Sequence, residues 1–99
     1  MFNKKLAIVG ASGAVGRVFI ELLDEIYPGT KDLFLVASKR SAGRSMFCGK
    51  QEFIIQDIEE FDFSQVEIAF FSAGAETAEK YAPIAVSQGC TVIDNSSQF

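Results

Sequence analysis

The chain has 99 residues, 48% of them apolar, which is enough for one hydrophobic core and for no more than one domain. Its formal net charge of −4 argues against a nucleic-acid partner, because a phosphate backbone favours a basic surface. Two cysteines and no histidine are too few for a disulfide framework or a metal site. No apolar run approaches the roughly 18 residues of a membrane span, and the amino terminus does not resemble a signal peptide, so we expect a reduced, cytoplasmic setting without a membrane partner.

The first part of the chain predicts two buried strands with a helix between them. Residues 5–9 form an apolar run that Gly10 ends, which is typical of a strand covered on both faces in a parallel sheet. Residues 33–37 form a second run of this kind. Between them, apolar residues recur at helical spacing until Pro28-Gly29. The apolar stripe expected for this helix consists of Val15, Val18, Phe19, Leu22 and Ile26.

The second part predicts two further core strands, at residues 66–71 and 91–93, with a helix between them in which Pro83 should cause a kink or a break. Residues 45–56 contain two short extended pieces split by Gly49-Lys50, which favours a hairpin or an edge ribbon. The acidic run 57–62 is read as a solvated loop or helix face, with an acidic docking patch as the alternative. This order of strands and helices predicts an α/β layered fold.

Small and hydroxyl-bearing residues follow all four principal strands. Because parallel strands end at one edge of a sheet, and ligands bind beyond those ends, we expect these residues to line one crevice. The four stretches are Gly10-Ala11-Ser12-Gly13-Ala14-Val15-Gly16, Ser38-Lys39-Arg40-Ser41, Ser72-Ala73-Gly74 and Asn95-Ser96-Ser97.

The glycine-rich stretch has the spacing G-x-x-G-x-x-G between a strand and a helix. Such a loop lets backbone N–H groups and the positive end of the helix approach a pyrophosphate. The alternative is a tight turn that binds nothing. For residues 72–74 and Asn95, which would line the path of a cofactor, the alternative is ordinary turn and capping chemistry.

The stretch after the second strand indicates which dinucleotide would bind. A free 2′-hydroxyl is usually met by a carboxylate at the end of that strand, whereas a 2′-phosphate needs hydrogen-bond donors and positive charge. Asp32 precedes the strand and stands at its wrong end, while Arg40 offers a planar guanidinium between Ser38 and Ser41. NADP is therefore favoured over NAD, and a solvated basic loop is the alternative.

Together, "GASGAVG", "ASKRSAG", "FFSAG" and "VIDNSS" resemble the amino-terminal cofactor half of aspartate-semialdehyde dehydrogenase. The resemblance implies a Rossmann-like, doubly wound, mostly parallel sheet with helices on both faces. It also implies NADPH-dependent reduction of aspartyl 4-phosphate to aspartate 4-semialdehyde with release of phosphate, toward lysine, threonine, methionine and diaminopimelate.

The resemblance further implies which residues bind the cofactor. Residues 12–15 would surround the pyrophosphate, Arg40 with its flanking serines would hold the 2′-phosphate, and residues 72–74, with Thr77 and Asn95, would line the remaining path. The full set is Gly10, Ser12, Gly13, Ala14, Val15, Gly16, Ser38, Arg40, Ser41, Ser72, Ala73, Gly74, Thr77 and Asn95.

The catalytic groups that the resemblance implies, a cysteine nucleophile and a histidine, have no counterpart here. The chain has no histidine, and Cys48 and Cys90 match no nucleophile motif and are expected to be buried, inert thiols. We therefore expect residues 1–99 to be one NADP-binding domain, a fragment without catalytic or metal-binding residues, whose catalytic and dimer-forming domain lies outside the chain. The alternatives are a fragment of an N-acetylglutamyl-phosphate reductase or a non-catalytic nucleotide-binding or interaction module.

Overall fold

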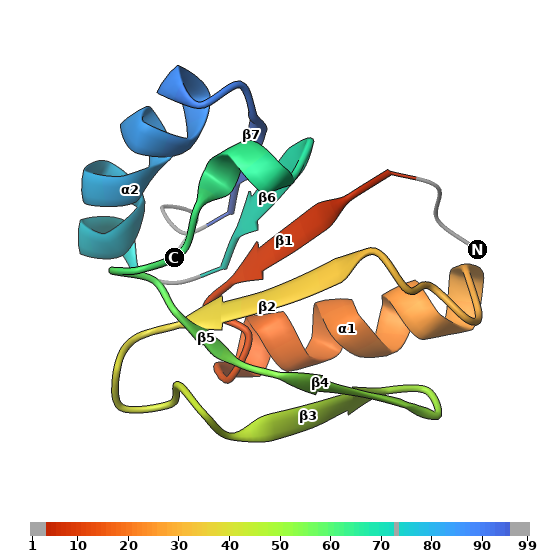
Figure 1. Cartoon of the computed structure of the whole chain (residues 1–99). Coiled ribbons are helices and arrows are strands. Elements are labelled where there is room, and N and C mark those ends of the chain that lie inside the picture. The colour runs from red at the N-terminus through yellow and green to blue at the C-terminus, as the bar shows by residue number, and fades with distance from the viewer. Residues whose placement is uncertain (1–3, 73, 96–99) are drawn as a thin grey trace.

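Five parallel strands form the central sheet of the protein, in the order β5-β2-β1-β6-β7 (Figure 1). The structure is a computed structural model that describes residues 4–72 and 74–95. The strands are β1 (Leu6–Val9), β2 (Leu33–Ala37), β5 (Gln56–Asp57), β6 (Ile68–Phe71) and β7 (Thr91–Asp94). The chain moves outward from β1 in one direction, then crosses to β6 and moves outward in the other, so the strand order reverses between β1 and β6.

Helical elements cover both faces of the sheet, as the sequence predicts (Figure 1). One face packs against helix α1 (Ala14–Ile26) and the antiparallel hairpin of β3 (Ser45–Cys48) and β4 (Gln51–Ile54). The other packs against α2 (Ala75–Ser87) and the short 3-10 helix η1 (Phe63–Gln65). None of the helices in the described ranges is long and apolar enough to cross a membrane.

The two cores meet at β1, whose residues are all buried. Because successive side chains of a strand point to opposite faces, Leu6 and Ile8 join the core beneath α1, while Ala7 and Val9 join the core beneath α2. In the second core the ring of Phe63 lies edge-on to that of Phe61, with centroids 5.0 Å apart. The continuous apolar character of residues 6–9 is thus explained by burial on both faces.

The predicted elements are confirmed, with two differences. Residues 45–56 do contain a hairpin, but the chain then adds the two-residue strand β5, which pairs with the end of β2. Pro83 lies inside α2 without dividing it.

Within the acidic run 57–62, Ile58 and Phe61 are buried, and Asp62 accepts a hydrogen bond from the Ser64 backbone N–H at the start of η1. The run is therefore a loop anchored by its two apolar residues.

The expected apolar stripe of α1 is wrong for most of its members. Val18, Leu22 and Ile26 are 55%, 48% and 64% exposed, and the buried positions of the helix are Gly16, Ile20 and Leu23. Both sets have helical spacing, so the pattern alone does not tell which one faces the sheet. The position of the β3–β4 hairpin beside the helix decides it, because the hairpin packs on the side that carries Ile20.

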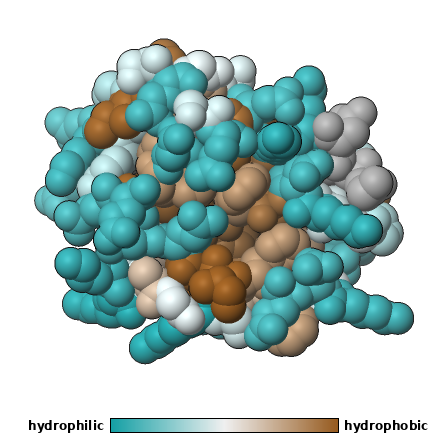
Figure 2. All heavy atoms as spheres, in the orientation of Figure 1, coloured by the Kyte–Doolittle hydropathy of each residue, from teal (hydrophilic) through white to brown (hydrophobic). Residues whose placement is uncertain are grey.

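This orientation leaves an apolar groove of about 290 Å³ between α1 and the β6–β7 side of the sheet. Phe19 and Leu22 of α1 line it together with Phe70 and Ile93 of the strands. The ring of Phe19 stacks on that of Phe70, with centroids 4.1 Å apart. On the face seen in Figure 2, hydrophobic side chains also form a strip between hydrophilic ones.

Truncation to alanine should have a large effect on stability at a buried apolar residue of α1 and a small one at an exposed apolar residue. Leu23→Ala removes a side chain that is 6% exposed and should cost about 2–5 kcal/mol of unfolding free energy. Ile26→Ala, three residues further along the same helix, should change it by less than about 0.5 kcal/mol. Urea unfolding followed by circular dichroism measures both; equal losses would contradict this orientation of the helix.

Candidate functional site

A pocket of about 320 Å³ lies at the edge where β1, β2 and β6 end, beside the point at which the strand order reverses. The residues that follow these three strands form most of its wall. Several of the predicted site residues therefore come together here, namely Gly10, Ser12, Gly13, Ser38, Ser72, Gly74 and Thr77.

Hydrogen bonds to β2 give the glycine-rich loop its shape. The backbone N–H groups of Gly10 and Ala11 both donate to the Val36 carbonyl, at 2.8 and 3.2 Å. Gly10 has a φ of +87°, a conformation that side chains disfavour, and this turns the chain sharply away from the sheet. The Gly13 N–H then donates to the Gly10 carbonyl at 3.0 Å, just before α1 begins.

Two helix amino termini start at the wall of the pocket without a side-chain cap. The N-cap residues are Gly13 for α1 and Gly74 for α2, and neither offers a side-chain acceptor to the first turn. Backbone N–H groups at the start of a helix have no partner within the helix and carry partial positive charge. A Cβ at Gly74 would meet no atom within 4 Å, so the backbone there is open to a ligand. The pocket thus suits an anionic group.

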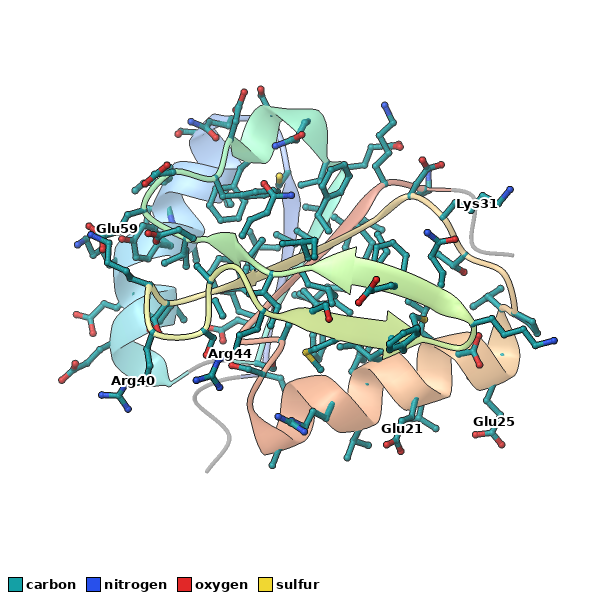
Figure 3. The ribbon with its side chains drawn as sticks, turned by 60° about the horizontal axis from the view of Figure 1, so that its bottom comes forward. Glu21, Glu25, Lys31, Arg40, Arg44 and Glu59 are labelled. Atoms are coloured by element: carbon teal, nitrogen blue, oxygen red, sulfur yellow. The ribbon has the colours of Figure 1, made fainter. Side chains whose placement is uncertain are left out.

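The basic stretch after β2 folds into a turn beside the glycine loop. The N–H groups of Ser41 and Ala42 both donate to the Ser38 carbonyl, at 2.9 and 3.1 Å. The turn places the Ser41 hydroxyl 3.0 Å from the Ser12 hydroxyl, which links the two loops directly. Arg40 and Arg44 extend from the β2–β3 connection on one side of the molecule (Figure 3). Ser41 therefore lies next to the pocket without lining it, and Arg40 precedes it in the same turn.

The other predicted residues lie around the pocket or outside the described part of the chain. Ala14 and Val15 are exposed at the start of α1, and Asn95 continues the β6–β7 ladder by donating its N–H to the Phe71 carbonyl at 2.9 Å. Gly16 is buried beneath the loop, where a Cβ would come within 2.4 Å of the Gly10 carbonyl oxygen. Ala73, like Ser96 and Ser97, falls outside the described residues.

Sequence reasoning missed the apolar floor of the pocket. Val9, Ala37 and Ile58 line it beneath the polar residues. Val9 and Ala37 are the last residues of β1 and β2, so the predicted strand ends already marked them. Ile58 arrives from the acidic run because β5 pairs with β2, and nothing in the local sequence indicates that pairing.

Neither cysteine has the environment of a nucleophile, as expected. Burial raises the pKa of the Cys48 thiol, and the carboxylate of Asp24 raises it further. Burial also raises the pKa of Cys90, whose thiol donates to the Phe63 carbonyl at 3.0 Å. Neither residue lines the pocket. Among residues 4–72 and 74–95 no group of three or more cysteine, aspartate or glutamate side chains is placed to hold a metal ion.

A doubly wound parallel sheet with a glycine loop and a pocket where its strand order reverses defines a Rossmann-like dinucleotide-binding domain. The chain belongs to the family described as semialdehyde dehydrogenase, NAD binding domain, whose model matches residues 5–99.

Comparison with individual proteins confirms the resemblance seen in the sequence. An aspartate-semialdehyde dehydrogenase from Shewanella violacea is 53% identical over 95 residues, which are 95% of this chain and 28% of the relative. The crystal structure of aspartate semialdehyde dehydrogenase II from Vibrio cholerae, complexed with ASA, is 49% identical with a TM-score of 0.88, over 95% of this chain and 31% of that one. The Candida albicans enzyme with NADP is 26% identical with a TM-score of 0.75, over 96% and 30%. The chain thus spans less than a third of the length of these relatives.

A methyl group at Gly16 should destabilise the fold, whereas one at Gly74 should not. Gly16→Ala brings Cβ against the backbone of Gly10 and Ala11 and should cost about 1–3 kcal/mol as overpacking. Gly74→Ala, the matched control, places its methyl group in open space at a φ of −64° that alanine readily adopts. Thermal unfolding of the two variants measures the difference, and an unchanged melting temperature in Gly16→Ala would contradict the close approach.

The raised pKa values predict slow thiol chemistry. At pH 8 an ordinary cysteine with a pKa of about 8.5 is partly ionised, but Cys48 and Cys90 should hold much less of the reactive thiolate. We expect the folded protein to react with Ellman's reagent much more slowly than the urea-unfolded protein. A fast phase in the folded state would show an activated thiol.

Proposed function

We propose that this chain is the cofactor-binding portion of an aspartate-semialdehyde dehydrogenase and that it binds NADP(H) in the pocket at the ends of β1, β2 and β6. The enzyme would reduce aspartyl 4-phosphate to aspartate 4-semialdehyde with release of phosphate. That reaction would serve the synthesis of lysine, threonine, methionine and diaminopimelate.

The convergence of two uncapped helix amino termini on one pocket carries this proposal. The first turns of α1 and α2 offer N–H donors and partial positive charge to the pyrophosphate, which is negatively charged. Gly10 and Gly13 keep the intervening backbone free of side chains, so that a ligand can approach it closely. Val9, Ala37 and Ile58 supply apolar surface beneath.

The turn after β2 supports a preference for NADP(H) over NAD(H). Arg40 is exposed and, within the described ranges, makes no ion pair, so its guanidinium is available for a 2′-phosphate. The Ser12–Ser41 hydrogen bond keeps that turn beside the pyrophosphate loop. Asp32, the acidic residue nearest β2 in sequence, precedes the strand, where its carbonyl accepts from the Leu6 N–H at the opposite edge of the sheet. The sequence of β2 and of the turn after it therefore supplies no carboxylate, although β5 brings Asp57 opposite Ala37, where its carboxylate accepts from the Glu59 N–H.

The chain's own residues would bind and orient the cofactor, which supplies the hydride when bound. Neither cysteine is placed to attack an acyl phosphate, since both are buried away from the pocket with raised pKa values. The nucleophile, the proton carrier and the dimer contacts of the enzyme would therefore come from polypeptide beyond these 99 residues. We expect the chain by itself to bind cofactor without catalysing reduction.

A non-catalytic nucleotide-binding module is the second candidate, and the lack of an activated thiol in the described residues favours it. The two candidates share the binding site and differ in what surrounds it. Adding the remaining part of the Shewanella violacea enzyme to this chain as a fusion distinguishes them. Phosphate-dependent oxidation of aspartate semialdehyde by the fusion supports the dehydrogenase; NADPH binding without turnover supports the module.

The role proposed for Arg40 predicts a selective loss of affinity on Arg40→Ala. Losing a charge-assisted hydrogen bond to the 2′-phosphate should weaken NADPH binding by about 1.5–3 kcal/mol, while NADH binding stays nearly the same. Lys39→Ala is the matched control, because Lys39 is the adjacent cation, is also exposed, and should contribute little. Fluorescence titration of both nucleotides against the three proteins gives the dissociation constants.

The titrations also test the proposal as a whole. Equal affinity of the wild-type chain for NADPH and NADH would contradict the 2′-phosphate assignment. Absence of binding by a chain that unfolds cooperatively would contradict the cofactor site itself.

A further inference from the structure

The corner formed by Val9 and Gly10, where the glycine loop leaves the sheet, is held from both sides. On the β2 side, the N–H groups of Gly10 and Ala11 donate to Val36. On the β6 side, Val9 pairs opposite Phe71, and Ser72, which directly follows that strand, adds further hydrogen bonds.

Ser72 makes three contacts with this corner. Its backbone N–H donates to the Val9 carbonyl at 2.9 Å. Its hydroxyl is within donating distance of the same carbonyl oxygen, at 2.9 Å, and of the Gly10 carbonyl oxygen, at 3.3 Å. The side chain is only half-buried and lines the pocket, yet its donor is directed inward, toward the protein.

These hydrogen bonds determine how the Ser72 hydroxyl can interact with a nucleotide. A pyrophosphate has only acceptor oxygens on its surface, so it needs a donor from the protein. The Ser72 hydroxyl has already donated its proton to the loop, and its remaining lone pairs would repel phosphate oxygens. A direct contact with the pyrophosphate would therefore break the hydrogen bond that holds the loop.

The Gly10 peptide is the part of the loop whose position matters most to the site. Its carbonyl accepts from the Gly13 N–H, the last residue before α1, and lies directly over Gly16. A rotation of this peptide would move the amino terminus of α1 relative to the pocket. The first-turn N–H groups on which anion binding depends would move with it.

From these contacts we infer that Ser72 is a positioning residue: its hydroxyl fixes the Val9–Gly10 corner so that the start of α1 is preorganised for a pyrophosphate. In this assignment the Ser72 hydroxyl contacts the loop and not the cofactor. The effect on nucleotide binding rests on the proposed function, whereas the effect on the position of the loop does not. Because both NADPH and NADH contain a pyrophosphate, the effect on binding should not discriminate between them.

The test compares Ser72→Ala with Ser72→Thr, which keeps the hydroxyl, and with Ser87→Ala. Ser87 is the matched control, because its hydroxyl also donates to a backbone carbonyl, that of Ile84, far along α2 from the pocket. Amide exchange with water, measured by NMR over the millisecond-to-hour range on the unliganded chain, reports on the loop. Nucleotide titrations report on binding.

In Ser72→Ala we expect the Gly13 N–H to exchange about 3- to 10-fold faster, as for one lost hydrogen bond, and by more than the core amide of Ile8. NADPH and NADH affinities should fall by similar factors of about 3 to 10, in contrast to the selective effect of Arg40→Ala. Ser72→Thr should restore both readouts, and Ser87→Ala should change neither.

Two results would overturn the inference. Weaker nucleotide binding with unchanged Gly13 exchange would mean that Ser72 contacts the cofactor directly, and an unchanged Gly13 exchange without any binding effect would mean that the hydroxyl does not hold the loop. If the wild-type chain binds neither nucleotide, the proposed function fails, while the exchange measurements still decide whether Ser72 fixes the corner.

Discussion

The site depends on the parallel pairing of β1 with two neighbours at once. In this register Val9 lies opposite Val36 of β2 and Phe71 of β6, so the chain leaves all three strands at one level. A slip of one residue would exchange the two faces of β1 and move Val9 from one core into the other. Burial on both faces therefore fixes the register, and the register brings the glycine loop, the basic turn and the start of α2 around one pocket.

The same small residues serve both the packing and the pocket. Gly16 lets the first turn of α1 rest on the Gly10 peptide, because a Cβ there would come within 2.4 Å of the carbonyl oxygen. Gly10 takes up a positive φ so that the chain can turn toward that helix at all. The amino terminus of α1 is brought to the pocket by this close packing, so stability and anion binding are not separable at these two positions.

Much of this arrangement was predictable from the sequence, because local signals and global fold agree over most of the chain. Four mainly apolar runs, the first of them ended by Gly10, predict the core strands, and the small and hydroxyl-bearing residues after them predict the pocket. The buried face of α1 was not predictable, since Ile20 and Leu23, like Leu22 and Ile26, have helical spacing and only the hairpin's position selects between the two pairs. The pairing of β5 and the hydrogen bond from the Ser72 hydroxyl to Val9 depend on contacts between distant segments, which no local pattern encodes.

The negative net charge of the chain does not conflict with an anionic ligand, because the charges are unevenly distributed. In Figure 3, Glu21 and Glu25 project from α1, whereas Arg40 and Arg44 extend from the β2–β3 connection; Glu59 lies on the same side of the view as Arg40. At physiological ionic strength the Debye length is about 8 Å, so exposed carboxylates at a greater distance are largely screened from the pocket. A ligand in the pocket meets at short range the partial positive charge of the two helix amino termini and the basic turn, partly offset by Glu76 in the first turn of α2 and by Asp57 opposite the end of β2. The overall charge thus opposes extended polyanions that must cover a broad surface, while the pocket itself favours a small one.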